Sequence, residues 1–153
     1  MESESKAAVA GGVTTVMDMP NTIPATTGAK EIKEKLALTR NRSSANIHFH
    51  IGATNSNHST LAQIASQGCP EEGLKAEDIA GIKVFMGSST GNMLVNDEES
   101  LKELFSIKEK PILVHCEDED TIKRNLQAAK EKYGDDIPFE EHKNIRSRMA
   151  CIK

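Results

Sequence analysis

Four apolar runs recur along this chain of 153 residues, and their starting points lie roughly 30–35 residues apart, the length of one βαβ unit. Their content of Val, Ile and Thr favours β-strands. The runs cover residues 13–17, 47–53, 79–86 and 111–116. They are nearly continuous in apolar residues, so each strand is expected to be covered on both faces, as in a parallel sheet.

The stretches between these runs carry apolar residues at helical spacing. Helices are expected over residues 3–10, 29–39, 59–65, 97–107, 120–133 and, as a short last piece, 139–150. The alternation predicts an α/β fold with four parallel strands in sequential order, each followed by a helix on the outer face. The first helix has no strand before it. No linker divides the chain, so residues 1–153 are expected to form a single domain with a core of its own.

Composition excludes several classes of protein. The net charge is -4 and no basic block stands out, so we expect neither a nucleic-acid nor an anionic-membrane partner. No apolar stretch is long enough to span a membrane, and the acidic start MESESK is unlike a signal peptide. The three cysteines form no CxxC pair, which is typical of a reducing compartment. The sequence therefore predicts a cytoplasmic protein.

Lys83 stands within an apolar run, and a buried ammonium is rare because its desolvation costs several kcal/mol. Three explanations are open: the side chain points outward between helices, it pairs with a carboxylate, or it is chemically modified. His115 ends the last apolar run, where an imidazole could ligate zinc. From the residues alone, a histidine hydrogen-bonded to a carbonyl is the favoured interpretation.

Three further residues could carry chemistry. Asn21 follows Pro20 at the end of the first run, and its amide could bind a carboxylate and an amide together, or only shape the turn. His48 and His50 alternate along the second run, which places both side chains on one face of a strand.

Three segments in this order resemble the dihydroorotases, which are cyclic amidohydrolases of pyrimidine synthesis. They read AGGVTT followed by DMPNT (residues 10–15 and 18–22), GIKVFMG (81–87) and ILVHCED (112–118). MPNT also differs from the allantoinases, which look more like MPLN. The resemblance implies a partial (β/α)8 TIM barrel that includes about strands two to five with their helices. It reaches from about Glu2 to about Cys151.

The same resemblance assigns roles to the candidates. Lys83 would be carboxylated by carbon dioxide and would bridge two zinc ions, His115 would bind one of them, and Asn21 would hold the carboxylate of the substrate. His48 and His50 are expected to be a decoy with a packing or supporting role, because their segment looks like the third barrel strand rather than the first. Glu117 and Asp118 could support the metal ligand or cap the next helix, and we favour the cap for Asp118.

The resemblance implies part of a zinc-dependent dihydroorotase, which reversibly hydrolyses dihydroorotate to N-carbamoyl-aspartate. The first-strand histidines, the sixth-strand histidine and the eighth-strand aspartate of that family have no match here, so no catalytic residue is assigned and the chain alone is expected to be inactive. Two alternatives stay open: a hydantoinase or dihydropyrimidinase, and a non-catalytic amidohydrolase-like module. Uncovered sheet edges would allow a homo-oligomer.

Overall fold

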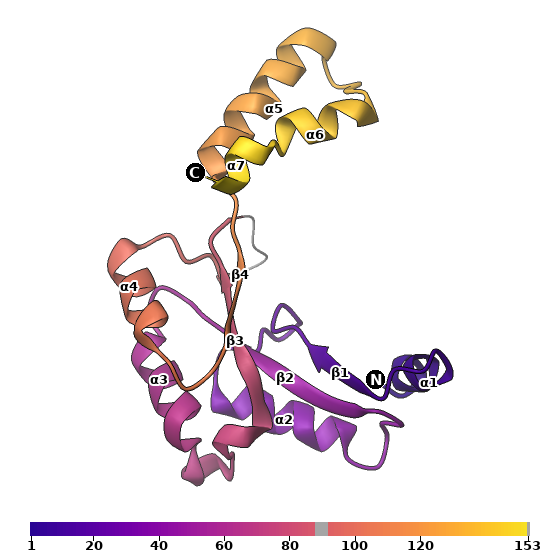
Figure 1. The fold of residues 1–153 in the computed structure, drawn as a ribbon, viewed down its shortest axis with the longest axis vertical. Helices are drawn as coiled ribbons and strands as arrows, with labels where there is room; N and C mark the ends of the chain where they lie inside the picture. The colour runs from indigo at the N-terminus through magenta and orange to yellow at the C-terminus, as the bar shows by residue number, and fades with distance from the viewer. Residues whose placement is uncertain (88–91, 153) are drawn as a thin grey trace.

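The computed structural model describes residues 1–87 and 92–152, and its centre is a parallel four-stranded sheet (Figure 1). The strand order is β1-β2-β3-β4, and every neighbouring pair is parallel. The strands are β1 (Thr15–Asp18), β2 (Asn46–Gly52), β3 (Ile79–Phe85) and β4 (Ile112–His115). The strands β3 and β4 lie within the predicted apolar runs, β1 ends one residue after its run and β2 starts one residue before its run, so the predicted parallel sheet in sequential order is confirmed.

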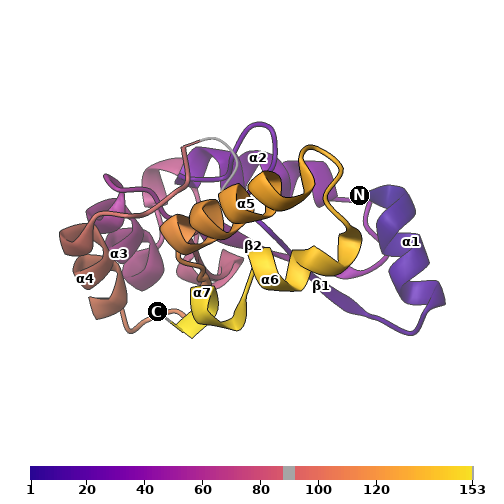
Figure 2. The same ribbon diagram turned by 90° about the horizontal axis from the view of Figure 1, so that it is seen from above.

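Three helices cover one face of this sheet, α2 (Ala29–Thr39), α3 (His58–Gln67) and α4 (Glu98–Ser106) (Figures 1 and 2). The core lies between them and the sheet. Its central side chains have at most 1% of their surface exposed, and they are Ile32, Phe49, Ile51, Leu61, Ile82, Val84 and Leu104. Aliphatic residues dominate this core, as the low aromatic content predicts. The curled sheet and its outer helices form part of a (β/α) barrel; which of eight barrel strands these four represent stays a prediction.

The N-terminal helix α1 (Glu2–Ala10) precedes β1 with no strand before it, as the sequence predicts. Ser5 attaches this helix to the rest of the molecule, because its buried hydroxyl accepts a hydrogen bond from the Ser44 amide at 3.0 Å. Gly12 then turns the chain into β1 with a φ of +85°, a value that glycine adopts without strain.

The C-terminal part departs from the expected pattern in two ways. The helix α5 (Glu119–Tyr133) extends beyond the carboxyl end of β4 rather than covering the outer face of that strand (Figure 1). Val114 on β4 consequently stays 45% exposed. The prediction of a covering helix after every strand is therefore wrong for β4.

The expected single helix over residues 139–150 is also wrong, because it is divided into a 3-10 turn (Phe139–Glu141), α6 (His142–Ile145) and α7 (Arg148–Ile152). The break lies at Arg146, where φ is -91° and ψ is 63°. The side-chain amide of Asn125 on α5 donates to the carbonyls of Asn144 and Ile145, at 3.1 Å each. These carbonyls are thereby satisfied without a continuing helix.

The expectation that both faces of the sheet are covered holds only in part, because the face opposite the helices is exposed at Met17 and the helical face is exposed at Val114. We call the face opposite the helices the inner face. Side-by-side partners in a parallel sheet point to the same face, so the strand register identifies its members. They are Met17, His48, His50, Gly52, Gly81, Lys83, Phe85, Leu113 and His115. Met17 is 59% exposed there, which leaves the end of this face on β1 open in the part of the chain that the structure describes.

Candidate metal-binding face

Lys83 and His115 lie on the inner face of two adjacent strands. In the register of β3 and β4, Lys83 pairs with Leu113 and Phe85 pairs with His115. The Phe85 ring neighbours both candidates: its centroid is 4.9 Å from the Lys83 Nζ and 6.3 Å from the centroid of the His115 ring. The fold therefore brings the predicted bridging lysine and the predicted imidazole ligand to the same patch of the sheet.

The surroundings of Lys83 bear on the three explanations for a lysine in an apolar strand: an outward side chain, a carboxylate partner or a chemical modification. Its side chain belongs to the inner face, so it does not point outward between the helices. None of the ion pairs formed among residues 1–87 and 92–152 includes it. Partial burial lowers the pKa of the Lys83 ammonium from its ordinary value. A lysine with a lowered pKa holds more free amine at neutral pH, the form that reacts with carbon dioxide.

His115 is engaged through one ring nitrogen. Its Nε2 lies 3.0 Å from Oε2 of Glu117, and that carboxylate is paired in turn with the Arg146 guanidinium. The hydrogen bond from Arg146 lowers the pKa of Glu117 from its ordinary value, and the bond to His115 acts in the same direction against the effect of burial. The sequence did not indicate Arg146, because its arrival at this point depends on the break between α6 and α7.

The two neighbours of His115 along the chain divide the roles that the sequence left open. Asp118 caps α5, and its carboxylate accepts a hydrogen bond from the Thr121 amide at 2.9 Å, which confirms the favoured interpretation. Glu117 instead contacts the candidate ligand.

The pair of histidines on β2 has unequal surroundings. His50 is 2% exposed, and its Nδ1 lies 3.1 Å from the carbonyl oxygen of Asp18 at the end of β1. His48 is exposed. His50 thus has the packing role expected for this pair, since it joins β2 to the last residue of β1.

Asn21 lies on the loop that leaves the carboxyl end of β1, and its side chain is exposed. The loop is fastened from α2 by Lys35, whose Nζ donates to Asp18 Oδ2 at 2.5 Å and to the Met19 carbonyl at 3.3 Å. The Thr26 amide donates to the Pro20 carbonyl at 2.9 Å. Asn21 therefore stands at the same end of the sheet as His115, but β2 and β3 separate the two strands that carry them.

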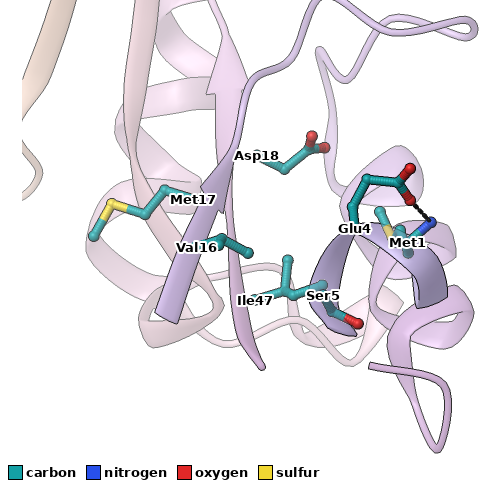
Figure 3. A pocket seen from close by; sticks show the side chains of 7 residues that line it. All are labelled: Met1, Glu4, Ser5, Val16, Met17, Asp18 and Ile47. Carbon is teal, nitrogen blue, oxygen red and sulfur yellow. Dashed lines mark ion pairs between the residues drawn. The ribbon is translucent and has the colours of Figure 1, made fainter. Parts of the chain in front are cut away.

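The donors found on this face do not complete a metal site. Within the described ranges, no group of three or more His, Cys, Asp or Glu side chains could hold a metal ion. A cavity of about 370 Å³ lies elsewhere, between α1 and β1, and is lined by residues such as Glu4, Val16 and Asp18 (Figure 3). It does not include Lys83 or His115, so this cavity is not the candidate site. Among the residues described, no helix is long and apolar enough to cross a membrane.

The fold is similar to that of solved hydantoinases. An L-hydantoinase from Arthrobacter aurescens superimposes with a TM-score of 0.79 over 97% of this chain and 31% of that enzyme, at 24% identity. A D-hydantoinase from Bacillus sp. AR9 gives a TM-score of 0.62 over 96% of this chain and 31% of its own, at 23% identity. At these identities the likeness shows the fold alone.

The sequence relatives are more specific, and they confirm the resemblance to dihydroorotases. The dihydroorotase of Methanosarcina acetivorans is 34% identical over 149 residues, which are 96% of this chain and 29% of that enzyme. The dihydroorotase of Methanosphaera stadtmanae is 29% identical over 95% of this chain. An allantoinase from Arabidopsis thaliana is 33% identical over 82% of it. No family model matches the sequence. The chain spans about 29% of the length of these dihydroorotases.

Proposed function

We propose that this chain supplies part of the metal and substrate site of a zinc-dependent dihydroorotase. The observation that carries the proposal is the placement of Lys83 and His115 on one face of adjacent strands, both next to Phe85. The relatives named dihydroorotase, which match nearly the whole chain, support the choice of substrate. The reaction would be the reversible opening of the ring amide of dihydroorotate to N-carbamoyl-aspartate.

Lys83 and His115 fit zinc in kind, although not in number. A partly desolvated lysine can react with carbon dioxide, and the carbamate that forms offers oxygen atoms to a metal. Among the described residues, no hydrogen bond to the Nδ1 of His115 is found, since the contact with Glu117 uses Nε2. A catalytic zinc usually has three protein ligands, and these two do not reach that number. When bound, zinc would lower the pKa of a water molecule and polarise the ring carbonyl.

The remaining role belongs to Asn21. Its amide would donate to the carboxylate of dihydroorotate and so orient the ring toward the inner face. This role separates the proposal from the hydantoinase and dihydropyrimidinase alternative, whose ring substrates lack the carboxylate.

A chimera tests the proposal. Residues 1–153 would replace the matching segment of the Methanosarcina acetivorans dihydroorotase, and bound zinc and turnover of dihydroorotate would be measured. We expect an active, zinc-containing enzyme. Lys83→Ala and His115→Ala should each lose metal and nearly all turnover. Asn21→Ala should keep the metal and raise KM, with a loss of about ten- to a hundredfold in kcat/KM, since a hydrogen bond to a charged group contributes roughly 1.5–3 kcal/mol.

His48→Ala is the matched control, because His48 is an exposed histidine of the same inner face. It should leave the zinc content unchanged. Loss of zinc in His48→Ala but not in Lys83→Ala would refute the assignment of ligands. Faster turnover of hydantoin than of dihydroorotate would favour the hydantoinase alternative. A folded chimera without zinc would favour a non-catalytic module.

A further inference from the structure

We infer that Glu117 and Arg146 are positioning residues for the His115 ring. They keep its hydrogen on Nε2, and the unprotonated Nδ1 then has a lone pair with which to bind a metal ion. The inference rests on the proposed function only for the nature of the ligand at Nδ1. The arrangement of the three side chains can be tested without any metal.

The geometry of Glu117 makes it an acceptor toward both partners. The Arg146 Nε donates to Oε1 at 3.0 Å, and the Nη2 of the same guanidinium contacts Oε2. Oε2 also lies 3.0 Å from the His115 Nε2. Arginine has only donors, and a carboxylate held in such a two-point pair has only acceptors to offer. The short contact to His115 is therefore satisfied when Nε2 carries the hydrogen.

The burial of the Glu117 side chain strengthens its hydrogen bonds to His115 and Arg146. The side chain of Glu117 is 11% exposed, whereas those of His115 and Arg146 are 40% and 35% exposed. A carboxylate removed from water costs free energy unless its oxygens are satisfied, so Glu117 binds its two donors strongly. Ligating histidines in metalloproteins commonly donate their second ring N–H to a carboxylate, which fixes both the tautomer and the ring orientation.

The C-terminal helices deliver Arg146 to this point. The Asn125 amide holds the carbonyls at the end of α6, and Arg146 follows in a non-helical conformation. The next helix is fastened beside the strand end, because the Asp118 amide donates to the Ala150 carbonyl at 2.7 Å. The helices α5–α7, which extend beyond the sheet, thus present a cation to the carboxyl end of β4 (Figure 1).

The competing explanation is that the Glu117–Arg146 pair only fastens these helices to the sheet. The two explanations differ at the imidazole. If the pair acts on His115, removing Glu117 changes the tautomer of the ring, whereas a mere fastening changes only the signals of the helices. A purely structural role of the Glu117–Arg146 pair would therefore leave the tautomer of His115 unaltered when Glu117 is removed.

The experiment uses the 15N-labelled chain without metal, at an alkaline pH where an ordinary imidazole is neutral. Long-range proton–nitrogen spectra report which ring nitrogen carries the hydrogen. We expect one tautomer of His115, protonated at Nε2. In Glu117→Ala the ring should exchange between both tautomers and show averaged nitrogen shifts. Glu117→Gln, which keeps the shape and one acceptor oxygen, should give an intermediate result. Glu99→Ala, an exposed glutamate paired with Lys102, is the control and should leave His115 unchanged.

Hydrogen on Nδ1 in the unaltered chain would overturn the inference, and so would equal tautomer populations in the unaltered chain and Glu117→Gln. The amide signals of Asp118 and Ala150 report whether the helices are still docked in each variant. Titration of the metal-free chimera with zinc then addresses the ligand: the affinity for zinc is expected to fall ten- to a hundredfold in Arg146→Ala. Hydrogen on Nε2 in the isolated chain together with a chimera that binds no zinc would contradict the proposed function and leave the positioning role standing.

Discussion

At the scale of single residues, Lys83 shows how position changes chemistry. It lies on the inner face of the apolar strand β3, and its Nζ is 4.9 Å from the centroid of the Phe85 ring. Burial lowers the pKa of Lys83. Lys102 on α4 has the opposite shift, because hydrogen bonds to Glu99 and Glu98 raise its pKa. The two lysines make an internal comparison within one chain.

Lys83 is predicted to be acetylated faster than Lys102 by trace acetic anhydride at mildly alkaline pH. A lowered pKa leaves a larger fraction of amine uncharged at any pH below the ordinary lysine value, and only the uncharged amine attacks. The difference should shrink as the pH rises above both pKa values. Peptide mass spectrometry measures the labelling, with the unfolded chain as the reference for intrinsic reactivity. Equal labelling of both lysines in the folded chain would contradict the lowered pKa of Lys83 as the factor that governs its reactivity.

At the scale of elements, a strand end is fastened to a helix. Lys35 on α2 is 9% exposed, and it joins Asp18 at the end of β1 to the Met19 carbonyl of the loop that carries Asn21. His50 holds the Asp18 carbonyl from β2. Two elements therefore define where the Asn21 loop begins.

Lys35→Met is predicted to lower the free energy of unfolding by about 1.5–3 kcal/mol, the usual contribution of a hydrogen bond to a charged group, since the variant leaves the half-buried Asp18 carboxylate without its partner. Denaturant unfolding followed by circular dichroism measures it. The matched control is Lys33→Met, because Lys33 lies on the same helix and pairs with Glu72 at the surface, where both side chains are at least 40% exposed. That change should stay within about 0.5 kcal/mol. Equal losses in the two variants would show that the Lys35 pair has no special role.

At the scale of the whole molecule, the sheet has two open edges. Within the described residues, β1 pairs only with β2 and β4 pairs only with β3. The inner face is open at Met17, which is 59% exposed. Unpaired strand edges beside exposed apolar side chains favour association with a second chain.

The isolated chain is predicted to self-associate with rising concentration. Met17→Lys should weaken this association, because a charge on the inner face at the edge strand opposes burial. Sedimentation velocity over a concentration series measures it. Phe139→Lys is the control, because Phe139 is 88% exposed but lies on the C-terminal helical unit away from the sheet. A purely monomeric chain, or equal effects of the two substitutions, would argue against association through the sheet.

Much of the fold could be predicted from local pattern. The strands and the helices α2–α4 follow from apolar periodicity, and the start of α5 follows from the capping carboxylate of Asp118. The resemblance singled out Lys83 and His115, and strand register then placed them on one face. Their roles as metal ligands, and that of Asn21 toward substrate, stay predictions.

The sequence by itself determined the order and direction of the strands, because those depend on the alternation of short apolar runs with amphipathic helices. Only the tertiary structure decided the contact of Glu117 with His115 and Arg146, the break before α7, and the path of α5 beyond β4. The physical reason is distance along the chain. A hydrogen bond between Asn125 and the carbonyls of residues 144 and 145, or between Arg146 and Glu117, leaves no periodic trace in the sequence. Such contacts exist only once the helices have packed and the donors and acceptors have been brought together.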